Sequence, residues 1–295
     1  MGPVTSPHAD DTALALSASQ REVWLDQRAW PGSTHLYIGG VAYLKGVLDV
    51  ARLLAALELL VAESDALRLV PHENGTQTLL KSIALPIEIS DLPRETDLHA
   101  AANAWWAQRI QKPFAWDGSP PWRFAVLCGA AGHHAIVMQY HHLVMDGWGT
   151  ALLIQRWSAL YNGLLRREEA QPAAAASYCS FIDESAVYTQ SPAFQTDGHY
   201  WLSQMPVLQP MLVDRPLAAD TAGLPAASMG HVSVPVADYE TLKSCATQRS
   251  STAFNYFLAA MVVYFSRTAN RQTVVLGVPS LNRVGRRYRS TLGMF

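Results

Sequence analysis

The sequence predicts an α/β fold made of two lobes of similar plan, and three observations lead to this prediction. Alternating apolar segments, typical of strands, are interspersed with segments of helical periodicity along most of the chain. The order strand, helix, strand recurs on both sides of an alanine-rich stretch at residues 171–177. The chain has 295 residues, of which 49% are hydrophobic and 16% charged, so it can bury two sizeable cores.

The first predicted lobe covers residues 14–177 and follows a leader, residues 1–13, that we expect to be disordered. Ser17 and Gln20 have the spacing of a capping box, so a helix should begin near Ser17 and end before Pro31. The other expected elements are a strand over 35–48, a helix from Asp49 to about 64, a hairpin over 67–80 turning at Asn74-Gly75, a helix through Trp105 and Trp106, strands over 124–128 and 134–140, and a helix over 148–165.

The second predicted lobe begins at residue 178, and we expect residues 178–295 to be only its first part. Its expected elements are a helical stretch through Tyr200 and Trp201, a proline-rich loop over 206–225, a strand over 231–236, helices from about 238 and 252, and a strand over 273–278. The apolar stretch 254–265 is too short to span a bilayer, so we predict a buried helix there. Residues 292–295 are apolar and lack capping or linker character, so we expect the chain to be part of a longer protein.

Composition excludes several classes of function. The formal charge of −2 does not fit a nucleic-acid binder. The three cysteines are far apart, which argues against a disulfide framework or a zinc ribbon and favours a reducing, cytoplasmic location. The first residues contain no apolar signal segment, and we expect no membrane association.

The sequence His-His-Leu-Val-Met-Asp-Gly at residues 141–147 is the sharpest chemical feature. It directly follows an apolar strand and precedes a helix, so it lies on a loop held by two rigid elements. Adjacent residues of an extended chain point in opposite directions, so His141 and His142 cannot face the same cleft. One exposed imidazole can take the proton of an amine or hydroxyl that attacks an acyl thioester, and main-chain N–H groups near Gly147 can stabilise the oxyanion.

These residues also have simpler interpretations than catalysis. A metal site made of His141, His142 and Asp146 is disfavoured because adjacent histidines on a strand diverge, so we expect no metal. Asp146 alone fits a turn or ion-pair residue better than an acid catalyst. The second histidine pair, at residues 133–134, has no Asp-Gly after it, and we interpret it as solvated or structural.

The complete HHxxxDG pattern resembles the active-site motif of the chloramphenicol acetyltransferase-like superfamily. Further stretches resemble motifs of the condensation domains of nonribosomal peptide synthetases within it. These stretches are residues 16–24 (SxAQxRLW, with Ser19 for Ala and Glu22-Val23 for Arg-Leu), 63–68 (RHExLR, without its leading Arg-His), 178–181 (YxDF, with Ser180 for Asp), the Tyr200-Trp201 pair, the strand and turn at 277–283, and 292–295 as the opening of GxFVNT. The resemblance runs in order from about residue 14 to residue 295.

This resemblance implies a V of two acetyltransferase-like lobes, the second incomplete here, with the HHxxxDG loop at their junction. It implies that His142 is catalytic, that His141 and Asp146 hold the loop, and that Gly147 lies at the oxyanion region. Arg283 is the implied ion partner of Asp146, with Arg68 as the alternative. No bound cofactor is implied, because the substrates arrive on phosphopantetheine or as acyl-CoA.

The function implied by the resemblance is amide formation between a donor acyl thioester and an aminoacyl group on an acceptor carrier protein, with an adenylation domain downstream. Two alternatives stay open, an ester-forming acyltransferase and a non-catalytic recruitment domain. The first motif begins about 16 residues after Met1, which leaves no room for a folded carrier if Met1 is the natural start. We then expect the donor in trans, as acyl-CoA or on a separate carrier, as in a starter domain that transfers a fatty acyl group.

Overall fold

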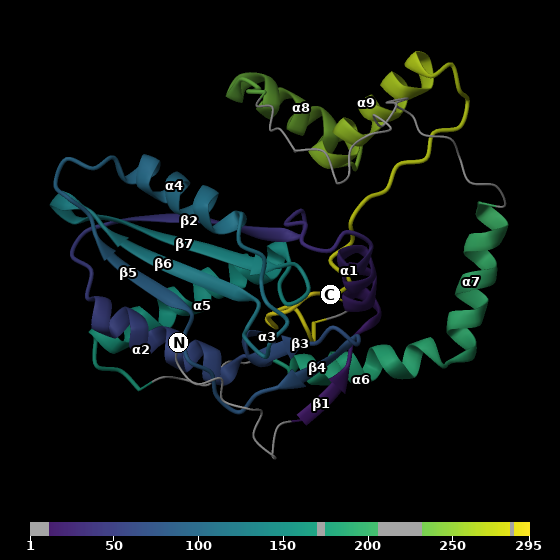
Figure 1. The fold of residues 1–295 in the computed structure, drawn as a ribbon. Helices are drawn as coiled ribbons and strands as arrows, with labels where there is room; N and C mark the ends of the chain where they lie inside the picture. The colour runs from purple at the N-terminus through teal and green to yellow at the C-terminus, as the bar shows by residue number, and fades with distance from the viewer. Residues whose placement is uncertain (1–11, 170–174, 206–231, 284–285) are drawn as a thin grey trace. The chain divides into compact units, whose positions relative to one another are not determined.

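The computed structural model describes residues 12–169, 175–205, 232–283 and 286–295. Its contacts divide the chain into a first unit, Met1–Phe194 with Leu281–Phe295, and a second unit, Gln195–Ser280 (Figure 1). The predicted leader lies outside the described residues up to residue 11, and residues 12 and 13 belong to a strand. The predicted proline-rich loop over 206–225 also lies outside them.

The first unit is built on a four-stranded sheet in the order β2-β7-β6-β5. Only β5 runs parallel to its neighbour, and the other pairs are antiparallel. The pairing of β2 with β7 runs from Tyr37 opposite His141 to Lys45 opposite His133, so β7 is held along its whole length. The bounds are β2 (Tyr37–Lys45), β5 (Ile87–Asp91), β6 (Trp122–Cys128) and β7 (His133–His141), with a 3-10 turn at Ala130–Gly132.

Helices cover both faces of this sheet (Figure 1). One face packs against α2 (Val50–Glu63) and α5 (Gly147–Leu165), and the other against α4 (Leu98–Ile110). Side chains of β6 alternate accordingly, because Phe124 and Val126 join the larger core while Ala125 and Leu127 join the core beneath α4. The sheet is therefore buried on both sides, and α5 leads away from the carboxyl end of β7.

A smaller three-stranded sheet, in the order β1-β4-β3, lies in the same unit. The Asn74-Gly75 hairpin is confirmed, since β3 and β4 pair antiparallel across it. Ser17 caps α1 with both hydrogen bonds of a capping box, as predicted. The bounds are β1 (Thr12–Ala15), β3 (Leu69–Pro71), β4 (Thr76–Leu79), α1 (Ala18–Ala29), α3 (Asp65–Arg68) and α6 (Tyr178–Thr189).

The contact division does not coincide with the predicted seam at residue 178. Helix α6 and residues 281–295 belong with the first unit, because Tyr178, Tyr288, Leu292 and Phe295 are buried in its larger core. We refer to residues 281–295 as the C-terminal segment. It brings residues that are distant in sequence against the loop between β7 and α5 (Figure 1).

The second unit contains most of α7 (Pro192–Gln204), with α8 (Val236–Gln248) and α9 (Ala253–Thr268). Two predicted strands are wrong: residues 232–235 and 273–278 form no strand, because a strand requires a hydrogen-bonded neighbour and none among the described residues pairs with them. The prediction that residues 254–265 form a buried helix is half wrong. They do form a helix, α9, but none of its described residues is buried.

Candidate active site

The loop between β7 and α5 is a packed structure. Strand β7 ends at His141, and α5 begins at Gly147 with Asp146 as its N-cap, whose Oδ1 accepts the Gly149 N–H at 2.6 Å. The three apolar residues of the loop, residues 143–145, are fully buried. A loop anchored in this way places its two histidines with little freedom.

His141 points into the protein. Its side chain is buried, its Nε2 lies 3.0 Å from Oε1 of Gln27, and its Nδ1 accepts the Leu143 N–H at 3.1 Å. The rings of Tyr37 and Trp116 contact it edge-on, each with ring centroids 5.6 Å away. Burial, reinforced by the neighbouring His142 and His35, lowers the pKa of His141 to about 3. His141 is therefore neutral near pH 7.

His142 is only partly buried. Its main-chain N–H donates to the Leu36 carbonyl at 2.8 Å, which ties the residue to the chain entering β2. Its Nδ1 is enclosed and has no hydrogen-bond partner in the described part of the chain. The ring is thus not oriented by a carboxylate, and the arrangement differs from a Ser-His-Asp triad.

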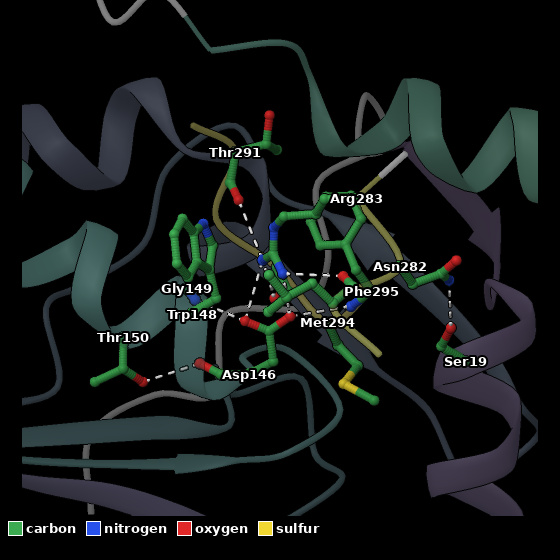
Figure 2. Close-up of polar contacts among 12 residues, drawn as sticks. Ser19, Asp146, Trp148, Gly149, Thr150, Asn282, Arg283, Thr291, Met294 and Phe295 are labelled. Atoms are coloured by element: carbon green, nitrogen blue, oxygen red, sulfur yellow. Dashed lines mark hydrogen bonds and ion pairs between the residues drawn. The ribbon is translucent and has the colours of Figure 1, made fainter. Parts of the chain in front are cut away.

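Asp146 joins the loop to the C-terminal segment (Figure 2). Its carboxylate forms a two-pronged ion pair with the Arg283 guanidinium, with Nη1 2.7 Å from Oδ2 and Nη2 3.0 Å from Oδ1. The Arg283 side chain is 2% exposed and the Asp146 side chain 15%, so the pair is largely shielded from water. The Arg283 guanidinium also lies over the Phe295 ring, 4.1 Å from its centroid.

Arg68, named above as the alternative partner of Asp146, does not contact it. The Arg68 guanidinium donates to Asp65 at 3.1 Å and to two main-chain carbonyls. That alternative is wrong, because helix α3 places a carboxylate three residues from Arg68 and the hairpin supplies a carbonyl to its other nitrogen.

Further hydrogen bonds join the C-terminal segment to the loop and to α5. The Asp146 N–H donates to the Gly293 carbonyl at 3.2 Å, and the indole N–H of Trp148 donates to the Arg289 carbonyl at 3.0 Å. A Cβ on Gly293 would lie 2.4 Å from the Tyr178 ring, so this close approach requires glycine.

The start of α5 is open. A Cβ on Gly147 would meet no atom within 4 Å, and the adjacent Trp148 is exposed. The main-chain N–H groups of Gly147 and Trp148 have no hydrogen-bond partner within the described residues. Unpaired N–H groups at a helix start are suited to binding a negatively charged oxygen.

Sequence reasoning missed the polar residues behind the loop. Gln20 and Gln27 are both buried residues of α1. Gln20 donates to the Leu143 carbonyl and is hydrogen-bonded to Gln77 of β4, and Oε1 of Gln27 is the partner of His141 Nε2. The signal available was weak: two glutamines seven residues apart in a predicted helix, a spacing that places them on the same face.

Comparison with known proteins places these observations in a family. The family profile described as the condensation domain matches residues 10–295. The chain belongs to the condensation-domain family. Related proteins include an isonitrile lipopeptide synthase of Streptomyces coeruleorubidus, 28% identical over 92% of this chain and 18% of the relative, and a dimodular nonribosomal peptide synthase of Bacillus subtilis (strain 168), 24% identical over 95% of this chain and 12% of the relative.

Solved condensation domains share the fold. A mutant of the starter condensation domain of rhizomide synthetase in complex with C8-CoA has a TM-score of 0.77 and 27% identity, covering 96% of this chain and 64% of that one. The first condensation domain of the calcium-dependent antibiotic synthetase has a TM-score of 0.79 at 24% identity, covering 96% and 67%. The predicted α/β, chloramphenicol acetyltransferase-like fold class is confirmed. This condensation domain spans about two thirds of those structures and at most 18% of the two synthases.

No group of three or more His, Cys, Asp or Glu side chains among the described residues is arranged to hold a metal ion. Within the same residues, no helix is both long and apolar enough to cross a membrane.

Proposed function

We propose that this condensation domain is of the starter type and forms an amide bond between a fatty acyl thioester and an aminoacyl group on a carrier protein. The observation that carries the catalytic part of the proposal is the separation of the two histidines, with His141 buried and His142 left partly exposed on the loop that leads to the open start of α5. The relative bound to C8-CoA supports an acyl-CoA donor.

In the proposed reaction the amine nitrogen attacks the thioester carbonyl and forms the new C–N bond. Nδ1 of His142 is enclosed, so Nε2 takes the proton that the amine loses. The free N–H groups of Gly147 and Trp148 donate to the oxyanion, which collapses as the C–S bond breaks. The proton on Nε2 then passes to the leaving thiolate, so the products are an amide and a free thiol.

A thioester is already activated, so a single positioned imidazole suffices and no covalent enzyme intermediate is required. Asp146 is proposed to act at a distance from the reacting atoms, since its carboxylate is occupied by Arg283 and by the start of α5. His141 is likewise excluded from proton transfer, because both of its ring nitrogens are engaged.

The test offers the full-length protein a series of acyl-CoA donors of increasing chain length together with an aminoacyl carrier protein, and measures the intact mass of the carrier. An N-acylated carrier whose yield depends on acyl length is the expected result. Product only from a peptidyl carrier would overturn the starter assignment, and product only from a hydroxyl acceptor would favour an ester-forming enzyme. Absence of product from every donor would favour the recruitment role.

A further inference from the structure

We propose that Gln27 is a positioning residue of this active site: it fixes His141 in the neutral form that carries its proton on Nε2, and through His141 it holds the loop that presents His142. The proposal rests on the proposed function in taking His142 as the reacting group. Gln27 itself lies behind His141 and does not touch the open side of the site.

The proton position on His141 follows from its neighbours. The Leu143 main-chain N–H can only donate, and it points at Nδ1 of His141 from 3.1 Å. Nδ1 must therefore carry a lone pair, and a neutral ring then carries its proton on Nε2. That proton faces Oε1 of Gln27 at 3.0 Å, which is an acceptor.

The orientation of the Gln27 amide is fixed independently. Its Nε2 donates to the carbonyls of Trp30 and Ser33 at 3.0 and 3.1 Å, at the end of α1. A flipped amide would set its oxygen against two carbonyl oxygens and its NH₂ group against the N–H of His141. In the hydrogen-bonded chain from the Trp30 and Ser33 carbonyls to the Leu143 N–H, each atom can therefore be assigned as donor or acceptor in only one way.

The same helix holds the loop at a second point. Nε2 of Gln20 donates to the Leu143 carbonyl at 3.0 Å, and the Gln20 amide also exchanges hydrogen bonds with Gln77. Gln20 and Gln27 are seven residues apart, so they lie two turns apart on the same face of α1. Together they hold the C=O of Leu143 directly and its N–H through His141.

These contacts matter for His142 because no side chain or carbonyl in the described part of the chain holds its ring by a hydrogen bond. Its Nδ1 has no partner among the described residues, so its direction depends on the backbone that carries it. Both peptide groups that flank it are held, the first by the Leu36 carbonyl at 2.8 Å and the second by His141. Loss of Gln27 would release the second of these anchors.

The experiment compares three glutamine-to-methionine variants of the full-length protein. Gln27→Met removes the acceptor for His141. Gln20→Met removes the donor to the Leu143 carbonyl, together with the hydrogen bonds of Gln20 to Gln77 and to the Ser17 N–H, but leaves the acceptor for His141 in place. Gln108→Met is the matched control on the exposed face of α4. Nitrogen-15 NMR of histidine-labelled protein reports which ring nitrogen of His141 carries the proton. Steady-state kinetics with the acyl-CoA donor and the aminoacyl carrier report kcat and KM.

We expect the proton of His141 on Nε2 in the wild type, in Gln20→Met and in Gln108→Met, and a mixture of the two neutral forms in Gln27→Met. Gln27→Met should lower kcat about 10- to 100-fold with little change in KM, as small misplacements of catalytic groups do. Gln20→Met should lower kcat without moving the proton. Gln108→Met should match the wild type in both measurements.

A wild-type protein with the proton on Nδ1 of His141 would overturn the proposal, whether or not any variant folds. So would a Gln27→Met protein whose His141 proton or whose kcat is unchanged. If the wild type makes no product with any donor, the proposed function fails, whereas the proton position in the resting protein still decides the structural half of this inference.

Discussion

The ion pair between Asp146 and Arg283 should hold the C-terminal segment onto the HHxxxDG loop, and its removal has a calculable effect. The Arg283 side chain is 2% exposed and makes two hydrogen bonds, at 2.7 and 3.0 Å, to the Asp146 carboxylate. Removing one partner of a buried pair costs about 3–5 kcal/mol, because the other charge is left without compensation. The cost of Arg283→Met should lie at the low end of this range, because the N–H groups of Gly149 and Phe295 still donate to the Asp146 carboxylate.

A loss of about 3 kcal/mol corresponds to an increase of about 100-fold in the population of detached segment. Arg286, Arg287 and Arg289 supply trypsin sites within that segment. When local opening is fast, the cleavage rate follows the open population, so Arg283→Met should be cut there about 100-fold faster than the wild type.

Asp146→Ala should be more damaging than Arg283→Met, because it also removes the N-cap of α5, worth about 1 kcal/mol. The double variant Asp146→Asn with Arg283→Met should recover part of the loss, since neither charge is then left buried alone. Urea unfolding monitored by tryptophan fluorescence measures these differences.

The matched control is Arg166→Met, which breaks an exposed ion pair with Glu168 whose side chains are 62% and 53% exposed. Such pairs contribute little, so neither trypsin cleavage nor the urea midpoint should change measurably. If Arg283→Met behaves like this control, the ion pair does not hold the segment and the reasoning is refuted.

Four further predictions concern the loop and its surroundings. His142→Ala should lower amide formation by about 10²- to 10⁴-fold without altering thermal unfolding. His133→Ala, at the exposed far end of β7, should change neither amide formation nor thermal unfolding. Near wild-type turnover in His142→Ala would contradict the catalytic role. Gly293→Ala should destabilise the protein to urea by about 1–3 kcal/mol, because its Cβ would lie 2.4 Å from a neighbouring aromatic ring at a positive φ, while Gly277→Ala, with no atom within 4 Å, should be nearly neutral. The pKa of His141 is lowered to about 3, below its value of about 6.5 in the unfolded chain, so unfolding takes up a proton and the free energy of unfolding should fall by about 2 kcal/mol from pH 7 to pH 5. His141→Asn should remove this dependence of the free energy of unfolding on pH, measured by urea titrations at each pH. An unchanged dependence in His141→Asn would refute the assignment to His141. Chelators should leave turnover unchanged, because both ring nitrogens of His141 are engaged in hydrogen bonds and cannot bind a metal ion; rescue of a chelated enzyme by zinc would contradict this.

The elements predicted correctly from the sequence are those whose signals are local. The capping box of Ser17, the cap at Asp49 and the Asn74-Gly75 turn each fix a boundary through contacts within a few residues. The alternation of β7 and the periodicity of α5 likewise show in short windows. The loop between them follows directly from those two boundaries.

The failed predictions depend on distant partners. The apolar pattern of α9 predicts a helix, but whether its apolar face is buried depends on what packs against it. Residues 273–278 have strand composition, yet no described residue pairs with them. Strand β5 was missed for the opposite reason, because a five-residue edge strand has little pattern of its own and is defined by its parallel pairing with β6.

The HHxxxDG pattern by itself establishes only that the two histidines diverge and that a helix starts after Asp146. His141 is held inside by Gln27, which lies 114 residues away in the sequence. The Asp146 carboxylate is paired with Arg283, which lies 137 residues away. Glutamine has no strong preference that a sequence window detects, and an arginine near the end of the chain has several carboxylates to choose from. In the proposed function the motif supplies the reacting imidazole, whereas α1 and the C-terminal segment, which contact the loop from opposite ends of the sequence, hold the loop that leaves His142 partly exposed.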